Sequence, residues 1–245
     1  MAAASPSSQR IKADQEHPGL RAAVFALMVV GSLGGFAVLW GVIRRLPEGT
    51  FLREFGLALS CLLAFPVGVA AAGLGELILK RLWPSGRGLN LDESGLEAQL
   101  PNGEGVRIQW SKRINPTCWY FSLRGFPRGG RERQVPASYT CLACQLQQDG
   151  RRLVVYTLAP ERQAAAYTQR GDFVRLRPGQ LYDSNMVRRF MIAPARPELP
   201  TSLLAGKDGP YWLAERRRWL EGLELKPEDF DNLMARLDAQ LEDQG

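Results

Sequence analysis

The sequence predicts a membrane-anchored α+β protein in which a two-helix transmembrane hairpin precedes a mainly β domain with C-terminal helices. Two long apolar runs within the first 82 residues predict the hairpin. Beyond residue 88, apolar and polar residues alternate with a period of two between glycine turns, which is typical of antiparallel strands. An amphipathic segment near the end of the chain predicts a helix that packs on those strands.

The first apolar run, residues 22–43, contains neither a charge nor a proline. A helix rises about 1.5 Å per residue, so this run crosses a bilayer core of roughly 30 Å. The second run, residues 55–75, holds Pro66, where we expect a mild kink because neighbouring helices satisfy the freed carbonyl. A cleaved signal peptide is the alternative for the first run. It is disfavoured because the run is long, lacks a following cleavage site and leads directly into a second span.

The connection between the runs, residues 44–54, is short enough to make the two helices antiparallel neighbours. Three basic residues precede the first run, three follow the second and three lie between them: Arg10, Lys12 and Arg21; Lys80, Arg81 and Arg87; Arg44, Arg45 and Arg53. By the positive-inside rule, we expect two spans of the cell inner membrane with both termini in the cytoplasm. The four cysteines agree, since they are too few for a secreted disulfide framework and fit a reducing compartment.

Small residues mark the expected packing faces of the two spans. The first span carries the G-x-x-x-G pair Gly31 and Gly35, and the second carries small residues at a spacing of four, namely Ala64, Gly68 and Ala72. We interpret them as the contact between the two helices, with a homo-oligomer or a partner span as the alternative. Glu76 has Lys80 one turn further on, which predicts an interfacial ion pair.

Beyond the boundary at residues 83–88, turns and alternation predict the remaining elements. Asn102-Gly103 and Asp149-Gly150 are expected hairpin turns. Strands are expected at residues 89–91, 96–100, 106–110, 118–125, 140–147, 151–158, 172–179 and 186–193, with a short helix at 160–170.

The predicted organisation is a polar tail (1–21), the hairpin (22–82), a mainly β domain (88–192), a proline-rich linker (193–209) and C-terminal helices (210–245). In the last helix, Pro227 suits the first turn, and the apolar stripe comprises Phe230, Leu233, Met234, Leu237 and Leu241.

The opening "LNLDESGL", a glycine turn, "VRIQW" followed by "SKRI", more strands and the terminal "PEDFDNLMARL" together resemble a known family. They are similar to the PH-like domains that many bacterial membrane proteins carry beside a transmembrane hairpin, over residues 88–123 and 226–241. The resemblance implies a partly open β-barrel covered at one end by the terminal helix. It also implies a protein-interaction or membrane-proximal module. The first turn here is the acidic "DESG", whereas phosphoinositide-binding PH domains carry basic residues there, so inositol-lipid binding through that turn is not expected.

Few residues offer catalytic chemistry. The single histidine, His17, lies in the polar tail, which excludes a histidine-dependent triad or a multi-histidine metal site within one chain. The sequence has no P-loop, dinucleotide fingerprint or paired-carboxylate signature, so we expect no cofactor and no enzyme activity. Cys141 and Cys144 form a C-x-x-C, but positions three apart on a regular strand point to opposite faces. A three-thiolate site with Cys118 therefore needs an intervening turn; Cys61 is interpreted as a small apolar residue of the second span.

Two arginine-rich segments allow opposite interpretations. Residues 124–133 could contact anionic lipid headgroups through Arg124, Arg128, Arg131 and Arg133, or could form a solvated loop. In residues 215–220, Trp219 lies a heptad after Trp212, which predicts a packed helix face. The arginines at 216–218 are expected on the solvent-exposed remainder of that helix. Nucleic-acid binding needs basic and aromatic residues on one open face, so it is not expected.

The function that these features favour is a non-catalytic, membrane-anchored interaction or scaffold protein with a cytoplasmic PH-like domain. Its expected partners are the lipid bilayer and an unidentified membrane or cytoplasmic protein, within a larger membrane complex or as a homo-oligomer. The alternative is a thiol-dependent or metal-dependent membrane enzyme or sensor that uses Cys118, Cys141 and Cys144.

Overall fold

The computed structural model describes residues 9–14, 18–99, 105–124, 133, 135–177 and 198–242. The chain divides into two units. We call residues 16–84 the hairpin unit, and residues 1–15 together with 85–245 the sheet unit. The expected turn at Asn102-Gly103 and the expected strand at 186–193 lie outside the described residues.

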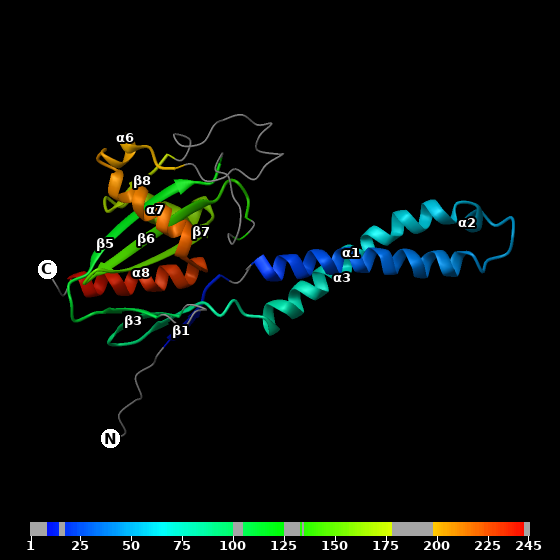
Figure 1. Ribbon diagram of the computed structural model, residues 1–245, viewed down its shortest axis with the longest axis horizontal. Coiled ribbons are helices and arrows are strands. Elements are labelled where there is room, and N and C mark those ends of the chain that lie inside the picture. The colour runs from blue at the N-terminus through cyan, green and yellow to red at the C-terminus, as the bar shows by residue number, and fades with distance from the viewer. Residues whose placement is uncertain are drawn as a thin grey trace, which may run out of the picture. The chain divides into compact units, whose positions relative to one another are not determined.

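The hairpin unit consists of two long helices joined by a short connection. Helix α1 spans Pro18–Ile43, α2 is a single turn at Phe51–Glu54, and α3 spans Gly56–Leu82 and continues through Pro66. Figure 1 shows α3 crossing α1. Both long helices have the length and apolar composition needed to cross a membrane, which confirms the two apolar helices that the sequence predicts. Most of their large apolar side chains are exposed.

The contact between α1 and α3 uses the predicted small residues. The buried face of α3 comprises Gly56, Ser60, Ala64, Gly68 and Ala72. The spacing of four therefore begins at Gly56, two repeats before the Ala64 that the sequence suggested. A Cβ atom at Gly31 would lie 2.7 Å from Ala71 Cβ, and one at Gly35 would lie 2.9 Å from Val67 Cγ1. Glu76 and Lys80 form the expected ion pair at 2.6 Å.

The sheet unit holds two sheets. The first has the order β1-β2-β3-β4, is antiparallel throughout, and comprises Gln9–Lys12, Gly88–Leu91, Gly95–Gln99 and Val106–Gln109. The second has the order β8-β5-β6-β7-β9 and comprises Phe173–Arg175, Asn115–Ser122, Thr140–Gln148, Arg151–Ala159 and Leu223–Leu225. Its central strands are antiparallel, whereas β8 and β9 join the edges in parallel.

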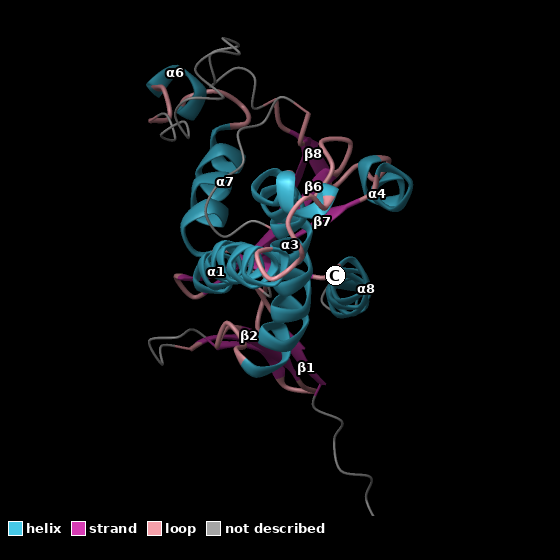
Figure 2. Ribbon diagram, turned by 90° about the vertical axis from the view of Figure 1, so that its right-hand side faces the viewer, coloured by secondary structure: helices cyan, strands magenta, loops and turns pink. Residues whose placement is uncertain are grey.

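Helices α4 (Glu161–Thr168), α6 (Thr201–Leu204), α7 (Gly209–Glu221) and α8 (Pro227–Glu242) complete the described elements. One face of the second sheet packs against the first sheet and α8, and the other face packs against α7. Figure 2 shows α7 and α8 on opposite sides of the sheet. Being covered on both faces explains why β6 is buried along almost its whole length.

Helix α8 uses the predicted stripe. Phe230, Leu233, Met234 and Leu237 are buried, and Leu241 packs against the same core. Polar contacts fix the helix beside α4. The Tyr167 hydroxyl donates to Asp231 at 2.7 Å, and Arg170 pairs with Asp238 at 2.7 Å.

Four expectations are corrected. The predicted polar tail supplies strand β1, which pairs with β2 across the hairpin insertion. The predicted linker contains helix α6, and the C-terminal helical segment contains strand β9. The strands of the described residues form two sheets rather than one barrel wall, since no ladder among them joins β4 to β5 or any other strand of the first sheet to the second. The edge strands β8 and β9 join the second sheet in parallel after the helical segments α4 and α7.

Candidate functional site

The segments that lead to and from the hairpin are fixed to each other within the sheet unit. Asp14 and Arg87 form a buried ion pair at 2.7 Å. The backbone N–H of Asp14 donates to the Glu224 carbonyl at 3.0 Å, and the Glu224 N–H donates to Asp14 Oδ1 at 3.1 Å. Asp14 adopts a φ of 49°, a left-handed conformation that aspartate tolerates. These contacts, which we call the root clamp, join β1 and β2 to β9.

The cysteines lie as regular strand geometry predicts. Cys144 faces Cys118 across the β5–β6 ladder, and both lie in the core shared with α8. Cys141 lies in the core on the other face, beside α7, so the structure does not bring the three thiols together. Burial and the neighbouring Cys118 thiol raise the pKa of Cys144 well above its ordinary value. Cys61 is exposed on α3, and none of the four cysteines forms a disulfide bond.

The described residues offer no grouping of three or more His, Cys, Asp or Glu side chains suited to a metal ion. A buried thiol that keeps its proton is a poor nucleophile and a poor metal ligand. Cys141 and Cys144 of the C-x-x-C therefore do not share a binding or redox site.

Two of the four arginines proposed for lipid contact belong to the described residues. Arg124 is exposed. Arg133 is held by protein groups, since its Nη2 donates to the Leu158 carbonyl at 2.9 Å and its Nε lies 3.3 Å from Glu224 Oε1. Arg128 and Arg131 lie outside the described residues.

Arg218 lies inside the protein rather than on the expected wet face of its helix. Its Nε donates to Glu215 Oε2 at 2.7 Å, and Trp119 Nε1 donates to the same oxygen at 3.0 Å. The guanidinium carbon lies 4.5 Å from the Tyr156 ring centroid and 5.5 Å from that of Phe121. The predicted packed face is present, with Trp212 buried and Trp219 partly buried.

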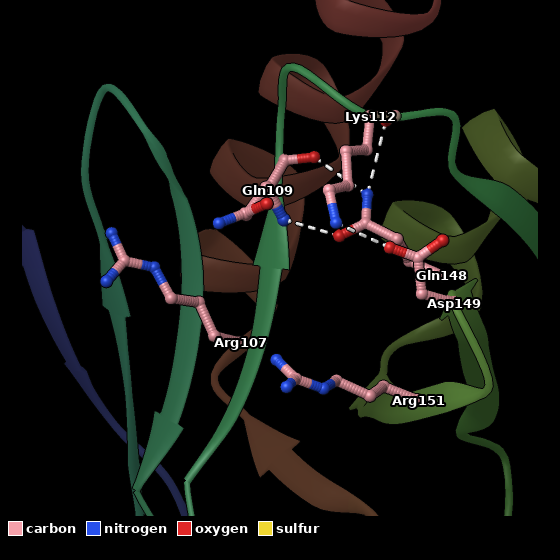
Figure 3. A pocket seen from close by; sticks show the side chains of 6 residues that line it. All are labelled: Arg107, Gln109, Lys112, Gln148, Asp149 and Arg151. Carbon is pink, nitrogen blue, oxygen red and sulfur yellow. Dashed lines mark hydrogen bonds and ion pairs between the residues drawn. The ribbon is translucent and has the colours of Figure 1, made fainter.

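A pocket of about 230 Å³ opens where the first sheet meets the β6–β7 hairpin. It is lined by six residues from these two walls: Arg107, Gln109, Lys112, Gln148, Asp149 and Arg151. Figure 3 shows Arg151 extending toward β4 and Lys112 meeting Asp149. Three of the six side chains are cationic and one is anionic, so the lining carries a formal charge of about +2.

Gln148 fixes the distance between the two walls. Its side chain is buried and forms two hydrogen bonds with the backbone of Gln109, accepting from the N–H at 2.8 Å and donating to the carbonyl at 2.8 Å. It also donates to the Lys112 carbonyl at 3.2 Å. The next two residues, Asp149 and Gly150, have φ values of 47° and 78°, which is the predicted tight hairpin turn. This turn places Arg151, the first residue of β7, on the pocket wall that the β6–β7 hairpin forms.

The sequence did not identify this pocket. The Asp149-Gly150 turn fixes the register of Gln148 and Arg151, but the approach of β4 to that turn depends on contacts between residues about 40 positions apart, such as Gln109 and Gln148. No protein-family model, curated protein or solved structure matches the chain. The geometry of the residues therefore carries the functional argument alone.

Proposed function

We propose that this chain is a membrane-anchored, non-catalytic interaction or scaffold protein. Its two apolar helices cross the inner membrane as a hairpin, and its sheet unit serves in the cytoplasm as a PH-like interaction module within a membrane complex. One observation supports this proposal above the others: strand β1 before the hairpin pairs with strand β2 after it. A chain that leaves and re-enters one sheet in this way must have both ends of the hairpin on the same side of a bilayer.

The surface of the hairpin supports its insertion. Side chains such as Val30 and Leu62 are 66% and 71% exposed, and the exposed apolar residues continue along both long helices. Proteins in water rarely leave so large an apolar surface uncovered. The root clamp and the excess of flanking basic residues agree with both ends on the cytoplasmic side.

The non-catalytic interaction role is supported by the structural contacts that the buried ionisable groups of the sheet unit make. The buried charges Asp14, Glu215, Arg218 and Glu224 all bond to other protein groups. Asp14 joins the segment after β1 to Glu224 of β9, and Glu215 joins α7 to β5 through Trp119. The antiparallel run from β2 to β4 and the docked helix α8 are the parts on which the resemblance to PH-like domains rests.

Membrane topology is tested by labelling single cysteines in intact spheroplasts. In a Cys61→Ala background, Glu48→Cys marks the connection between the helices and Glu161→Cys marks the sheet unit. We expect a membrane-impermeant maleimide to label position 48 from outside and position 161 only after permeabilisation. Labelling of both positions from the same side would overturn the topology.

The interaction role is tested by placing a photo-crosslinking residue at exposed positions of the sheet unit and irradiating intact membranes. We expect discrete adducts from a cluster of positions on one face, and none from a probe at buried Leu142. A dimer-sized adduct identifies a homo-oligomer, and a larger or smaller one identifies another protein. If every exposed position gives no adduct, the proposal of an interaction module fails.

The thiol alternative is favoured by one observation, the pairing of Cys118 with Cys144 across β5 and β6. Replacing Cys141 and Cys144 by serine separates it from the preferred function. If the protein depends on its thiols or on a metal, the double variant loses bound metal or cellular function. If it is an interaction module, neither changes, and only its stability can differ.

A further inference from the structure

The pocket between the two sheets has features that the proposed membrane anchoring does not require. Among the described residues, no carboxylate lies within ion-pair distance of Arg151 or Arg107. Arg107 Nη2 instead donates at 2.8 Å to the Ser94 hydroxyl, which in turn donates to Asp92 Oδ1 at 2.6 Å. An anion can replace this hydroxyl as the acceptor, but the Asp92 carboxylate behind it makes Arg107 a weaker contributor than Arg151. Both arginines are exposed side chains on the rim of a pocket whose walls Gln148 holds together.

The third cation is held by a weak pair. Lys112 Nζ lies 2.7 Å from Asp149 Oδ2, and the two side chains are 52% and 62% exposed. Exposed ion pairs of this kind contribute little, because water and salt screen them. Lys112 can therefore leave Asp149 for a stronger anionic ligand, while Asp149 is the one negative charge in the lining that opposes such a ligand.

From this lining we propose that the pocket binds a phosphate group. Guanidinium groups present several donors in a planar fork that suits the oxygens of phosphate, and Lys112 and the Gln109 amide add further donors. The volume of about 230 Å³ accommodates a phosphate group with some water, since one water occupies about 30 Å³. The group belongs either to inorganic phosphate or to the headgroup of an anionic lipid, which present the same chemistry to the pocket.

The pocket lies entirely within the sheet unit. Its phosphate binding would therefore stand if the topology proposed above were wrong. None of its described lining residues belongs to 124–133, the segment for which the sequence suggested contact with lipid headgroups. The basic residues of the pocket come from β4, the turn that follows β4 and the start of β7.

The test uses the full chain in nanodiscs of phosphatidylcholine, titrated with inorganic phosphate by calorimetry at constant ionic strength maintained with chloride. We expect saturable binding that Arg151→Gln weakens about tenfold, with a smaller loss for Arg107→Gln. Arg162→Gln, which removes an exposed arginine on α4 outside the pocket, should leave the affinity unchanged. Thermal unfolding without phosphate shows that each variant is folded.

Asp149→Asn gives a change of opposite sign. Asparagine tolerates the φ of 47° at this position and keeps the turn, while the opposing charge and its ion pair with Lys112 are removed. We expect phosphate to bind several-fold more tightly to this variant. A structural role of the turn alone would not produce a tighter complex.

Repeating the titration in nanodiscs that contain phosphatidate distinguishes the two sources of phosphate. If the pocket takes a headgroup, the lipid competes and weakens the apparent affinity of the unmodified chain for inorganic phosphate. If it takes free phosphate, the affinity is the same in both bilayers. The proposal is overturned if the unmodified chain shows no saturable binding. It is also overturned if Arg151→Gln matches Arg162→Gln, or if Asp149→Asn fails to tighten binding.

Discussion

The two units of this chain place opposite kinds of side chain in their interiors. The hairpin unit turns large apolar residues outward and packs its helices through Gly, Ser and Ala. The sheet unit buries large apolar residues and, with them, complete ion pairs. This packing is the one expected for the membrane insertion proposed above, because lipid offers no hydrophobic drive between helices and close backbone contact takes its place. The sheet unit follows the rule for proteins in water, where burial of apolar area drives folding and buried charges must be paired.

The largest expected change in stability follows from replacing Arg218, whose side chain is completely buried in the sheet unit. We expect Arg218→Ala to lower the free energy of unfolding by about 3–5 kcal/mol, because Glu215 keeps its charge in the core without its partner. Urea unfolding of the sheet unit, followed by tryptophan fluorescence in the full chain, measures the change. Arg216→Ala, at an exposed position of the same helix, should stay within about 0.5 kcal/mol. Equal losses at the two positions would contradict the importance of the buried pair.

Asp14 of the root clamp has a matched counterpart in Asp149 of the β6–β7 turn, within the same unit. Asp14 and Asp149 both have positive φ, 49° and 47°, and each pairs with a cation at 2.7 Å. They differ in burial, since the Asp14 side chain is 1% exposed and the Asp149 side chain is 62% exposed. Changing each to asparagine therefore isolates the effect of burial on an ion pair.

We expect Asp14→Asn to cost about 1.5–3 kcal/mol, because Arg87 loses its charged partner while Asn can still accept from Glu224. Asp149→Asn should cost between about 0 and 1 kcal/mol. Urea unfolding measures both values, and amide hydrogen exchange in β1 and β2 shows whether the loss loosens the clamp. Exchange in β1 that does not increase in Asp14→Asn would show that the clamp does not hold this strand.

In the hairpin unit the corresponding test adds volume rather than removing charge. A Cβ at Gly68 would lie 2.6 Å from the Met28 carbonyl oxygen and 3.0 Å from the Ser32 nitrogen, whereas Gly73 on the same helix has nothing within 4 Å. Gly68→Val should therefore force α1 and α3 apart at a cost of about 1–3 kcal/mol. Gly73→Val changes helix propensity equally and has space for the new side chain.

Disulfide formation between Leu27→Cys and Gly75→Cys reports the helix separation, because a Cβ at Gly75 already meets the Leu27 side chain. With Cys61 replaced by alanine, we expect slow crosslinking in Gly68→Val and unchanged crosslinking in Gly73→Val. If both variants crosslink at the unmodified rate, α1 and α3 do not pack through this face.

The same contrast explains what the sequence could predict. The two long apolar helices, the α8 stripe and the Asp149-Gly150 turn are local patterns, and the opposite faces of Cys141 and Cys144 follow from strand geometry alone. Strand β1 escaped prediction because its short segment "QRIK" has one apolar residue and pairs with a strand beyond the hairpin. The burial of Arg218 and the pocket beside β4 depend on which distant elements meet, and an arginine in a sequence shows no sign of its eventual burial.

The smallest effect concerns the thiols, which the two units also treat differently: Cys61 is exposed on α3, and Cys144 is buried in the sheet unit. Burial raises the pKa of Cys144, so the folded protein keeps a proton that the unfolded chain releases above the ordinary cysteine pKa. The unfolded state then binds fewer protons, and stability falls as the pH rises through that range. The slope from one such group is at most about 1.4 kcal/mol per pH unit.

Cys144→Ala removes this contribution. We expect the free energy of unfolding, measured by urea titration between about pH 8 and 10, to fall less steeply with pH in this variant than in the unmodified chain. Cys61→Ala, which alters the exposed thiol, should leave the slope unchanged. Tyr167, whose pKa burial also raises, is present in all three proteins and cancels from the comparison. A slope that Cys144→Ala does not change would mean that this thiol ionises inside the folded protein, and would strengthen the thiol-dependent alternative at the expense of a purely structural cysteine.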